Sequence, residues 1–354
     1  MSQTMTSLQR ILTALGQKPP DRVPFVLPVT MHAARQMGLS LREYFSKAEY
    51  VAEGQLRARD QFRHDAVVGF LYAPVEVEAW GGEVIFFDDG PPNSGEPFIR
   101  KPEDISHLQS PQIENCPSMM RTIEVLRLLK ERIGDDALIL GVVMSPFSLP
   151  VMQMGFDHYL QVMYECPHLF ERLMQVNEAF CVDWANRQVA AGAMAIVYFD
   201  PVSSTTIIPR EKYLQSGFLI AQRVIAQIKA PVVTHFASGR CLPILADVAQ
   251  TGTVLVGVSV EEDLRALKSA AAGKVSLLGN LNAIEMRRWT PQQAEVAVKD
   301  CIARAAEGGG YILADNHGEI PYQVPEEVLM AISEAVHRWG NYPLDWVKGD
   351  AAPH

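Results

Sequence analysis

The chain has 354 residues, 48% of them hydrophobic, and a formal net charge of -10, which is enough for one large α/β domain or two ordinary ones. The acidic balance without a basic stretch argues against nucleic acid as a partner, and no apolar run approaches the ~20 residues that cross a bilayer. Five scattered cysteines and an N-terminus without a signal-peptide pattern predict a cytoplasmic protein with reduced thiols.

The first third of the chain is predicted to carry additions to a repeated core. Residues 1–20 are predicted to form a helical extension, with the helix itself at residues 7–15. Apolar runs then predict strands at residues 22–28 and 65–70. Residues 81–112 are rich in Pro, Gly and Asp, so we predict an inserted hairpin or loop there.

Further along, short apolar strands alternate with segments of helical period. The strands are continuous apolar runs, as expected when both faces of a parallel sheet are covered. The predicted strands are residues 137–143, 195–199, 231–235, 254–258, 275–279 and 311–314. The predicted helices are residues 170–190, 211–229, 243–250 and 291–308.

About eight β-α repeats favour a (β/α)8 TIM barrel, a fold that typically needs ~250 residues. We therefore predict that residues 1–354 form a single barrel domain. A doubly wound open sheet is the alternative, but the first β-α turn lacks a glycine-rich phosphate loop.

The active site of such a barrel lies at the carboxyl ends of its strands. His235 ends a middle strand, and His317 follows the last one in a cluster with Asp315 and Glu319. Imidazoles at one rim can bind a metal or move a proton near neutral pH. A catalytic zinc site needs three ligands and an open position, which His235, His317 and either Glu319 or Cys241 would supply. A metal-free pair of histidines, oriented by Asp315 or Glu319, is the alternative.

Other strand ends supply further candidates. Asp200 is predicted to orient the substrate or to act as an acid or base, although Asp-Pro also starts turns. Asn280 and Arg240 are predicted to contact polar substrate atoms, and Arg240 can bind a carboxylate or phosphate bidentately. Met144 suits a wide apolar mouth, although methionine also fills cores.

Several motifs occur in a fixed order along nearly the whole chain. They are Pro20-Asp21-Arg22-Val23-Pro24, Asp200-Pro201, Ile208-Pro209-Arg210-Glu211, the His235 loop before Pro243-Ile244-Leu245, Leu278-Gly279-Asn280-Leu281-Asn282, and Gly318-Glu319-Ile320-Pro321 with Val324-Pro325-Glu326-Glu327. In this order the chain resembles the uroporphyrinogen decarboxylase superfamily, and its corrinoid-dependent methyltransferase branch looks nearest. The resemblance implies a (β/α)8 barrel.

The decarboxylase of this superfamily binds the carboxylates of its tetrapyrrole with an arginine-rich motif after the first strand, and it carries an aspartate in the second. Here the first strand leads into Pro28-Val29-Thr30-Met31-His32-Ala33-Ala34-Arg35, without that motif. Tyr72 falls where the aspartate is expected, so we predict that Tyr72 contacts the substrate. Decarboxylation of uroporphyrinogen is therefore not expected.

The methyltransferase branch typically holds zinc with His-x-Cys at a middle strand end and a second cysteine near the last strand. His235 matches the histidine, whereas Ala237 stands where the first cysteine is expected and His317 stands near the second. The changed ligand set implies another metal arrangement or another methyl donor or acceptor.

The hypothesis is zinc-assisted methyl transfer between a small methylated substrate and a corrinoid such as methylcobalamin. The substrate would be of the methoxylated aromatic, methylamine or thiol type, and a separate corrinoid-binding protein would carry the corrinoid. A metal-free carboxy-lyase and a non-catalytic corrinoid or tetrapyrrole binder are the alternatives. Members of the family include monomers and dimers, so a homodimer is one of two expected states.

Overall fold

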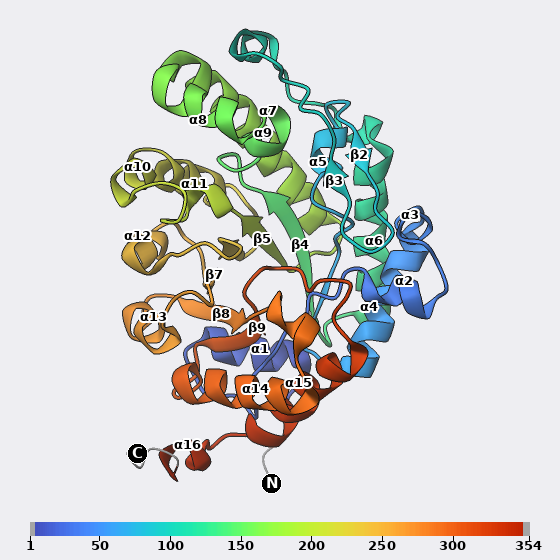
Figure 1. Ribbon diagram of the computed structural model, residues 1–354, viewed down its shortest axis with the longest axis vertical. Helices are drawn as coiled ribbons and strands as arrows, with labels where there is room; N and C mark the ends of the chain where they lie inside the picture. The colour runs from blue at the N-terminus through green and yellow to red at the C-terminus, as the bar shows by residue number, and fades with distance from the viewer. Residues whose placement is uncertain (1–3, 350–354) are drawn as a thin grey trace.

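The computed structural model describes residues 4–349, and its main sheet has seven parallel strands in sequence order (Figure 1). They confirm seven of the predicted strands. Their bounds are β1 (Ala66–Val68), β4 (Leu138–Met144), β5 (Ala195–Phe199), β6 (Val232–His235), β7 (Leu255–Gly257), β8 (Ser276–Leu281) and β9 (Tyr311–Asp315).

Residues 24–26 occupy the eighth position and close the sheet between β9 and β1. Phe25 pairs in parallel with Leu313 of β9, and the Val26 N–H donates to the Leu313 carbonyl at 2.9 Å. On the other side, the Asp65 N–H donates to the Phe25 carbonyl at 2.9 Å. The predicted (β/α)8 barrel is thereby confirmed.

The predicted strand at residues 22–28 is wrong in one respect, because only two isolated bridges form there, Arg22 with Asn341 and Phe25 with Leu313. Pro24 and Pro28 lack the backbone N–H that a regular ladder of hydrogen bonds requires. The residues still fill the strand position, but they do so with few hydrogen bonds.

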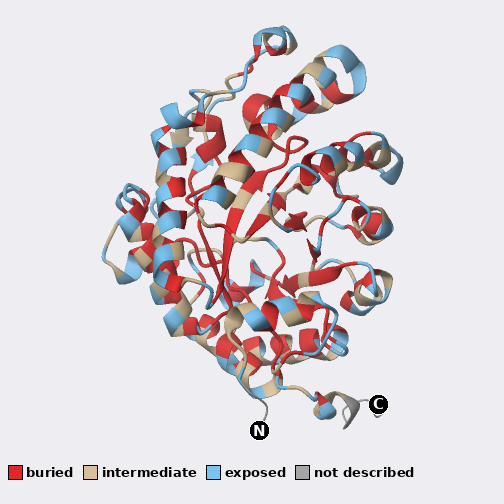
Figure 2. Cartoon of the chain, turned by 180° about the vertical axis from the view of Figure 1, so that it is seen from behind, coloured by how far each residue is buried: buried red, intermediate tan, exposed pale blue. Residues whose placement is uncertain are grey.

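Helices surround the strands, and Figure 2 shows buried strands inside a partly exposed helical layer. The α-helices are α1 (Ser7–Leu15), α2 (His32–Gln36), α3 (Leu41–Tyr44), α4 (Ala48–Phe62), α5 (Val75–Glu78), α6 (Pro117–Ile133), α7 (Pro150–Met154), α8 (Phe156–Glu165), α9 (Pro167–Ala190), α10 (Arg210–Gln215), α11 (Gly217–Ile225), α12 (Leu245–Val248), α13 (Leu264–Ala271), α14 (Pro291–Ala305), α15 (Glu326–Trp339) and α16 (Asp345–Gly349). The 3₁₀ helices are η1 (Pro102–His107), η2 (Ile113–Asn115), η3 (Pro201–Ser203), η4 (Leu242–Ile244) and η5 (Glu285–Arg288). None of the helices in the described residues is long and apolar enough to span a membrane.

The predicted helix at residues 211–229 is wrong, because the chain forms two helices, α10 and α11, with a break at Ser216. Ser216 has φ -137° and ψ -84°, which are not helical angles. Close packing accompanies the break, since a Cβ atom on Gly217 would lie 2.4 Å from Oγ of Ser203. Two shorter helices thus fit under the loop that follows β5.

The excursion predicted at residues 81–112 contains a small antiparallel hairpin. Its strands are β2 (Val84–Ile85) and β3 (Asn93–Ser94). This hairpin lies outside the barrel sheet, so the prediction of an inserted hairpin is confirmed.

Helix α1 covers the end of the barrel at which the strands begin. Thr6 caps it by accepting the Gln9 N–H at 3.2 Å, and the Gln9 side chain accepts the Thr6 N–H at 3.0 Å. Ile11 is fully buried and packs on inward-facing strand residues such as Ala66 and Leu138. The helical extension therefore completes the core at this end of the barrel.

Ile11→Ala is expected to lower the free energy of unfolding by about 2–4 kcal/mol, because it removes buried methylenes and leaves a cavity. Chemical denaturation monitored by circular dichroism measures this loss. Leu12→Ala is the matched control, since Leu12 is 55% exposed on the same helix and its truncation should change stability by less than about 0.5 kcal/mol. Equal losses in both variants would contradict this account of α1.

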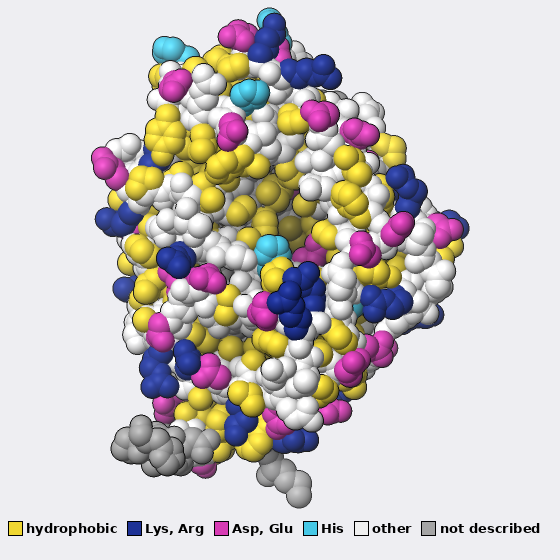
Figure 3. Space-filling view, in the orientation of Figure 1, with side chains coloured by type: hydrophobic (Ala, Val, Ile, Leu, Met, Phe, Trp, Pro, Cys, Tyr) yellow, Lys and Arg dark blue, Asp and Glu magenta, His cyan; other side chains and the backbone are white. Residues whose placement is uncertain are grey.

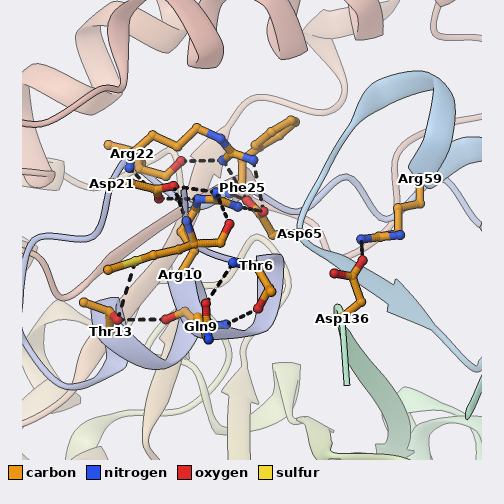
Figure 4. Close-up of polar contacts among 12 residues, drawn as sticks. Thr6, Gln9, Arg10, Thr13, Asp21, Arg22, Phe25, Arg59, Asp65 and Asp136 are labelled. Atoms are coloured by element: carbon orange, nitrogen blue, oxygen red, sulfur yellow. Dashed lines mark hydrogen bonds and ion pairs between the residues drawn. The ribbon is translucent and has the colours of Figure 1, made fainter. Parts of the chain in front are cut away.

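A buried ion cluster joins α1 to the closing segment and to β1 (Figure 4). Asp65 is fully buried, and it accepts hydrogen bonds from Arg10 at 2.7 Å, from Arg22 at 2.8 and 3.0 Å, and from the Phe25 N–H at 3.0 Å. Asp21 accepts two further hydrogen bonds from Arg10, at 2.6 and 2.8 Å. One carboxylate thus fixes three separate segments at the point where the barrel closes.

Candidate active site

A cavity of about 230 Å³ opens at the carboxyl ends of the strands. Figure 3 shows a hollow with a mostly hydrophobic wall and with histidine, acidic and basic side chains at its edge. No Lys or Arg is among the described residues that line the cavity. The apolar wall includes Val68, Phe70, Leu140, Val142, Val197 and Phe199. The polar lining residues are Thr30, Glu76, His235, Asp315, His317 and Glu319.

His235 lies at the end of β6 with only 3% of its surface exposed. Its ring stacks on Phe199, with centroids 5.6 Å apart and an interplanar angle of 18°. Nδ1 accepts the Ala237 N–H at 3.0 Å, so Nε2 carries the proton of the neutral ring. Burial, and to a smaller extent His317, lower the pKa of His235 to about 4. At neutral pH the ring therefore offers an uncharged N–H.

Asp315 shapes the loop that carries His317. Its Oδ2 atom accepts the His317 N–H at 2.7 Å and the Gly318 N–H at 2.8 Å. Burial raises the pKa of Asp315, although these two N–H groups oppose the shift. The exposed His317 ring places Nδ1 2.9 Å from Oγ of Ser238, which belongs to the His235 loop. The loops after β6 and β9 are therefore joined across the rim.

Glu319 completes this side of the rim. Its carboxyl group is hydrogen-bonded to the Thr30 hydroxyl, which follows the closing segment of the barrel. Burial is the main cause that raises the pKa of Glu319 to about 7; the charge of Asp315 adds to the shift, and Thr30 opposes it. The pKa of Glu319 thus lies near neutral pH.

Glu76, in α5, is a lining residue that the sequence analysis missed. It is 2% exposed, and Oε1 accepts the Met144 N–H at 2.9 Å. Oε2 is buried without a hydrogen-bond partner among the described residues. Burial raises the pKa of Glu76 to about 8, so this carboxyl group is mainly protonated at neutral pH. The signal in the sequence is an acidic residue between Val75 and Val77, shortly after a strand.

The structure brings together four of the residues predicted from strand ends. Met144, His235, His317 and Glu319 all line the cavity. Asp200 does not: it is buried outside the lining and accepts the hydroxyl groups of Ser145 at 2.6 Å and Ser148 at 2.7 Å. It holds the loop after β4 rather than facing the cavity.

Three predicted substrate contacts also lie outside the cavity lining. The Tyr72 hydroxyl donates to Glu78 at 3.1 Å within the core around the first helices. Asn280 donates to the Ser259 carbonyl at 2.9 Å. The Arg240 side chain is 57% exposed at the surface.

The predicted zinc ligands share the cavity only in part and are not arranged around one point. Cys241 is fully buried, does not line the cavity, and has a pKa raised by burial and by Glu262. Within residues 4–349, no group of three or more His, Cys, Asp or Glu side chains is arranged to hold a metal ion. His235, His317 and Glu319 therefore do not fit the predicted zinc site, and we assign no chemical step to zinc.

Comparison with known proteins identifies the family of the chain. A family model described as uroporphyrinogen decarboxylase (URO-D) matches residues 6–339. The chain belongs to the URO-D family. The family prediction from the sequence motifs is thereby confirmed.

Curated relatives in this family bear the name uroporphyrinogen decarboxylase. The protein from Methylococcus capsulatus is 26% identical, and the match covers 93% of this chain and 97% of the relative. The protein from Ralstonia pickettii is also 26% identical, with coverage of 91% and 93%. The chain is therefore similar to these enzymes over almost their whole length.

Solved structures with the same fold have other names. A methyltransferase from Methanosarcina mazei superposes with a TM-score of 0.83 at 22% identity, covering 94% of this chain and 99% of that one. A B12-independent methionine synthase from Shewanella sp. W3-18-1 gives a TM-score of 0.53 at 12% identity, covering 84% and 89%. At these identities the likeness shows the fold alone, so the activity must be argued from the cavity.

Proposed function

We propose that this URO-D family protein transfers a methyl group from a small methylated donor to a corrinoid carried by a partner protein. The observation that supports the proposal most is the apolar cavity, whose described lining residues include buried acids and histidines but no Lys or Arg. A tetrapyrrole with many carboxylates needs cations to bind it. The cavity supplies none, which argues against decarboxylation of uroporphyrinogen.

The size of the cavity supports a small donor. A cavity of about 230 Å³ has room for a small molecule such as a substituted benzene. Phe70 and Phe199 offer ring faces or edges to such a molecule. Among the donor types considered, a methoxylated aromatic compound fits these walls best.

The chemistry required is cleavage of a methyl–oxygen bond. The methyl carbon moves to the corrinoid, which supplies the electron pair of the new bond, while the electrons of the C–O bond remain on oxygen. That oxygen is a poor leaving group unless it receives a proton or hydrogen bonds. His235 offers an uncharged Nε2–H, and the acids of the lining offer protons.

The test is a methyl-transfer assay with purified protein and free cob(I)alamin as the acceptor. Methoxylated benzenes, methylamines and methyl thioethers are supplied as donors, and the conversion to methylcob(III)alamin is followed by absorbance. We expect conversion with the methoxylated benzenes. No conversion with any donor, together with release of CO2 from uroporphyrinogen, would instead establish the decarboxylase named in the curated relatives.

Gly257→Ala is expected to slow this methyl transfer by on the order of 100-fold, because it displaces His235. A Cβ atom on Gly257 would lie 2.3 Å from Cδ2 of His235, whose ring is already stacked on Phe199. The initial rate with free cob(I)alamin measures the effect. Gly90→Ala is the control, since its Cβ atom would meet no atom within 4 Å. A Gly257→Ala enzyme with the wild-type rate would show that the position of His235 is unimportant.

A further inference from the structure

We infer that Glu76 is the catalytic acid that protonates the leaving oxygen of the methyl donor. The inference rests on the proposed methyl transfer. Glu76 lines the cavity from the β1 side, and its two oxygens are in different environments. Oε1 is fixed by the Met144 N–H, whereas Oε2 has no hydrogen-bond partner among the described residues. A carboxylic acid held in this way keeps its O–H for a ligand.

The surroundings of Glu76 keep the group uncharged in the absence of a ligand. Behind it, α9 contributes the Trp184 indole and the Cys181 thiol, neither of which carries a positive charge. The described residues that line the cavity in front include no Lys or Arg, and the only opposing influences on the Glu76 carboxyl group are the Met144 N–H and the Trp184 indole N–H. In such an environment desolvation disfavours the carboxylate, so Glu76 stays in its protonated form. This burial raises the pKa of Glu76 to about 8.

The other groups of the lining are less suited to this role. Glu319 is already engaged with the Thr30 hydroxyl. His235 is uncharged at neutral pH, with a pKa of about 4, and a neutral imidazole is a much weaker acid than a carboxyl group. His317 is exposed and bonded to Ser238 at the rim. Glu76 is therefore the buried acid with an unengaged oxygen.

The step balances without an additional reactant. As the C–O bond of the donor breaks, its electron pair stays on the oxygen, and the Glu76 proton moves to that oxygen. The products are a phenol or alcohol, the methylated corrinoid and the Glu76 carboxylate. Because a buried carboxylate is unstable next to apolar walls, water that enters after product release protonates it again.

The experiment compares Glu76→Gln with wild type on methoxybenzenes whose phenol products differ in acidity, using free cob(I)alamin as acceptor. Without an acid the leaving group must depart as an anion, so weakly acidic phenols should suffer most. We expect kcat to fall by about 100-fold for a simple methoxybenzene and by less than about 3-fold for a nitro-substituted one. Glu78→Gln is the matched control on the same helix, since Glu78 bonds to Tyr72 outside the cavity and should keep the wild-type rates.

A second measurement does not depend on turnover. The infrared difference spectrum of wild type minus Glu76→Gln should show the C=O stretch of a protonated carboxyl group at about pH 7 and lose it above about pH 9. Absence of that band, or equal rate losses for all leaving groups, would overturn the role of Glu76 while leaving methyl transfer intact. A wild-type enzyme that transfers no methyl group from any donor would overturn both. Thermal unfolding of each variant shows that rate losses do not come from misfolding.

Discussion

Asp65→Asn is expected to lower the free energy of unfolding by about 3–5 kcal/mol, a large part of the stability of an ordinary domain. Asp65 is fully buried and compensates the charges of both Arg10 and Arg22. Asparagine keeps one carbonyl oxygen, but it removes the negative charge and turns an acceptor into a donor that faces two guanidinium groups. The two arginines would then be buried without sufficient countercharge.

Urea denaturation of wild type and Asp65→Asn measures this loss. The matched control is Asp136→Asn, because Asp136 pairs with Arg59 but its side chain is 54% exposed. An exposed pair contributes less than about 1 kcal/mol, so this variant should remain near wild type. A loss below about 1 kcal/mol for Asp65→Asn would mean that the cluster in Figure 4 is not what closes the barrel.

The fold was predictable because its main signal is repetition along the chain. Apolar strands separated by helical segments indicate a parallel barrel whatever their individual bounds. The first strand position shows the limit of this reasoning. Pro24 and Pro28 interrupt its ladder, and it is the contact of Phe25 with Leu313 that reveals its place.

The candidate site was only partly predictable, because a strand end does not determine which way a side chain points. Side chains alternate along a strand, so Val197 and Phe199 of β5 face the cavity and Asp200 does not. In β6 the same alternation turns His235 inward. Counting in steps of two from the apolar lining positions would have separated Asp200 from His235 in the sequence.

Glu76 was beyond this reasoning for another reason. It lies in the short helix α5 after β1, a strand of only three residues, so no strand end points to it. Its importance comes from burial and from an unbonded oxygen, which are properties of the packed molecule. Likewise, Cys241 follows His235 in the same loop, but the loop turns at Ala237, whose φ is +52°, and Cys241 lies outside the cavity lining.

The same acid should make the protein less stable as the pH rises. The pKa of Glu76 is about 8 in the folded protein, against an ordinary value of 4.5. The folded state therefore holds this proton more tightly than the unfolded state does. Its stabilising contribution is complete below about pH 4.5 and falls as the pH rises toward about 8, above which it is fully lost. At 1.36 kcal/mol for each pKa unit, the total change is on the order of 5 kcal/mol.

Glu76→Gln is expected to remove this pH dependence, because glutamine has no proton to lose. The free energy of unfolding of Glu76→Gln minus that of wild type should therefore increase by several kcal/mol between about pH 4.5 and about pH 9. The two proteins must be compared with each other, because Glu319, with a pKa of about 7, lowers the stability of both as the pH rises. Denaturation curves across this range measure the difference, and Glu78→Gln should follow wild type throughout. Parallel curves for wild type and Glu76→Gln would mean that Glu76 already loses its proton at the ordinary pH, and the argument for a stored acid in the cavity would fail with it.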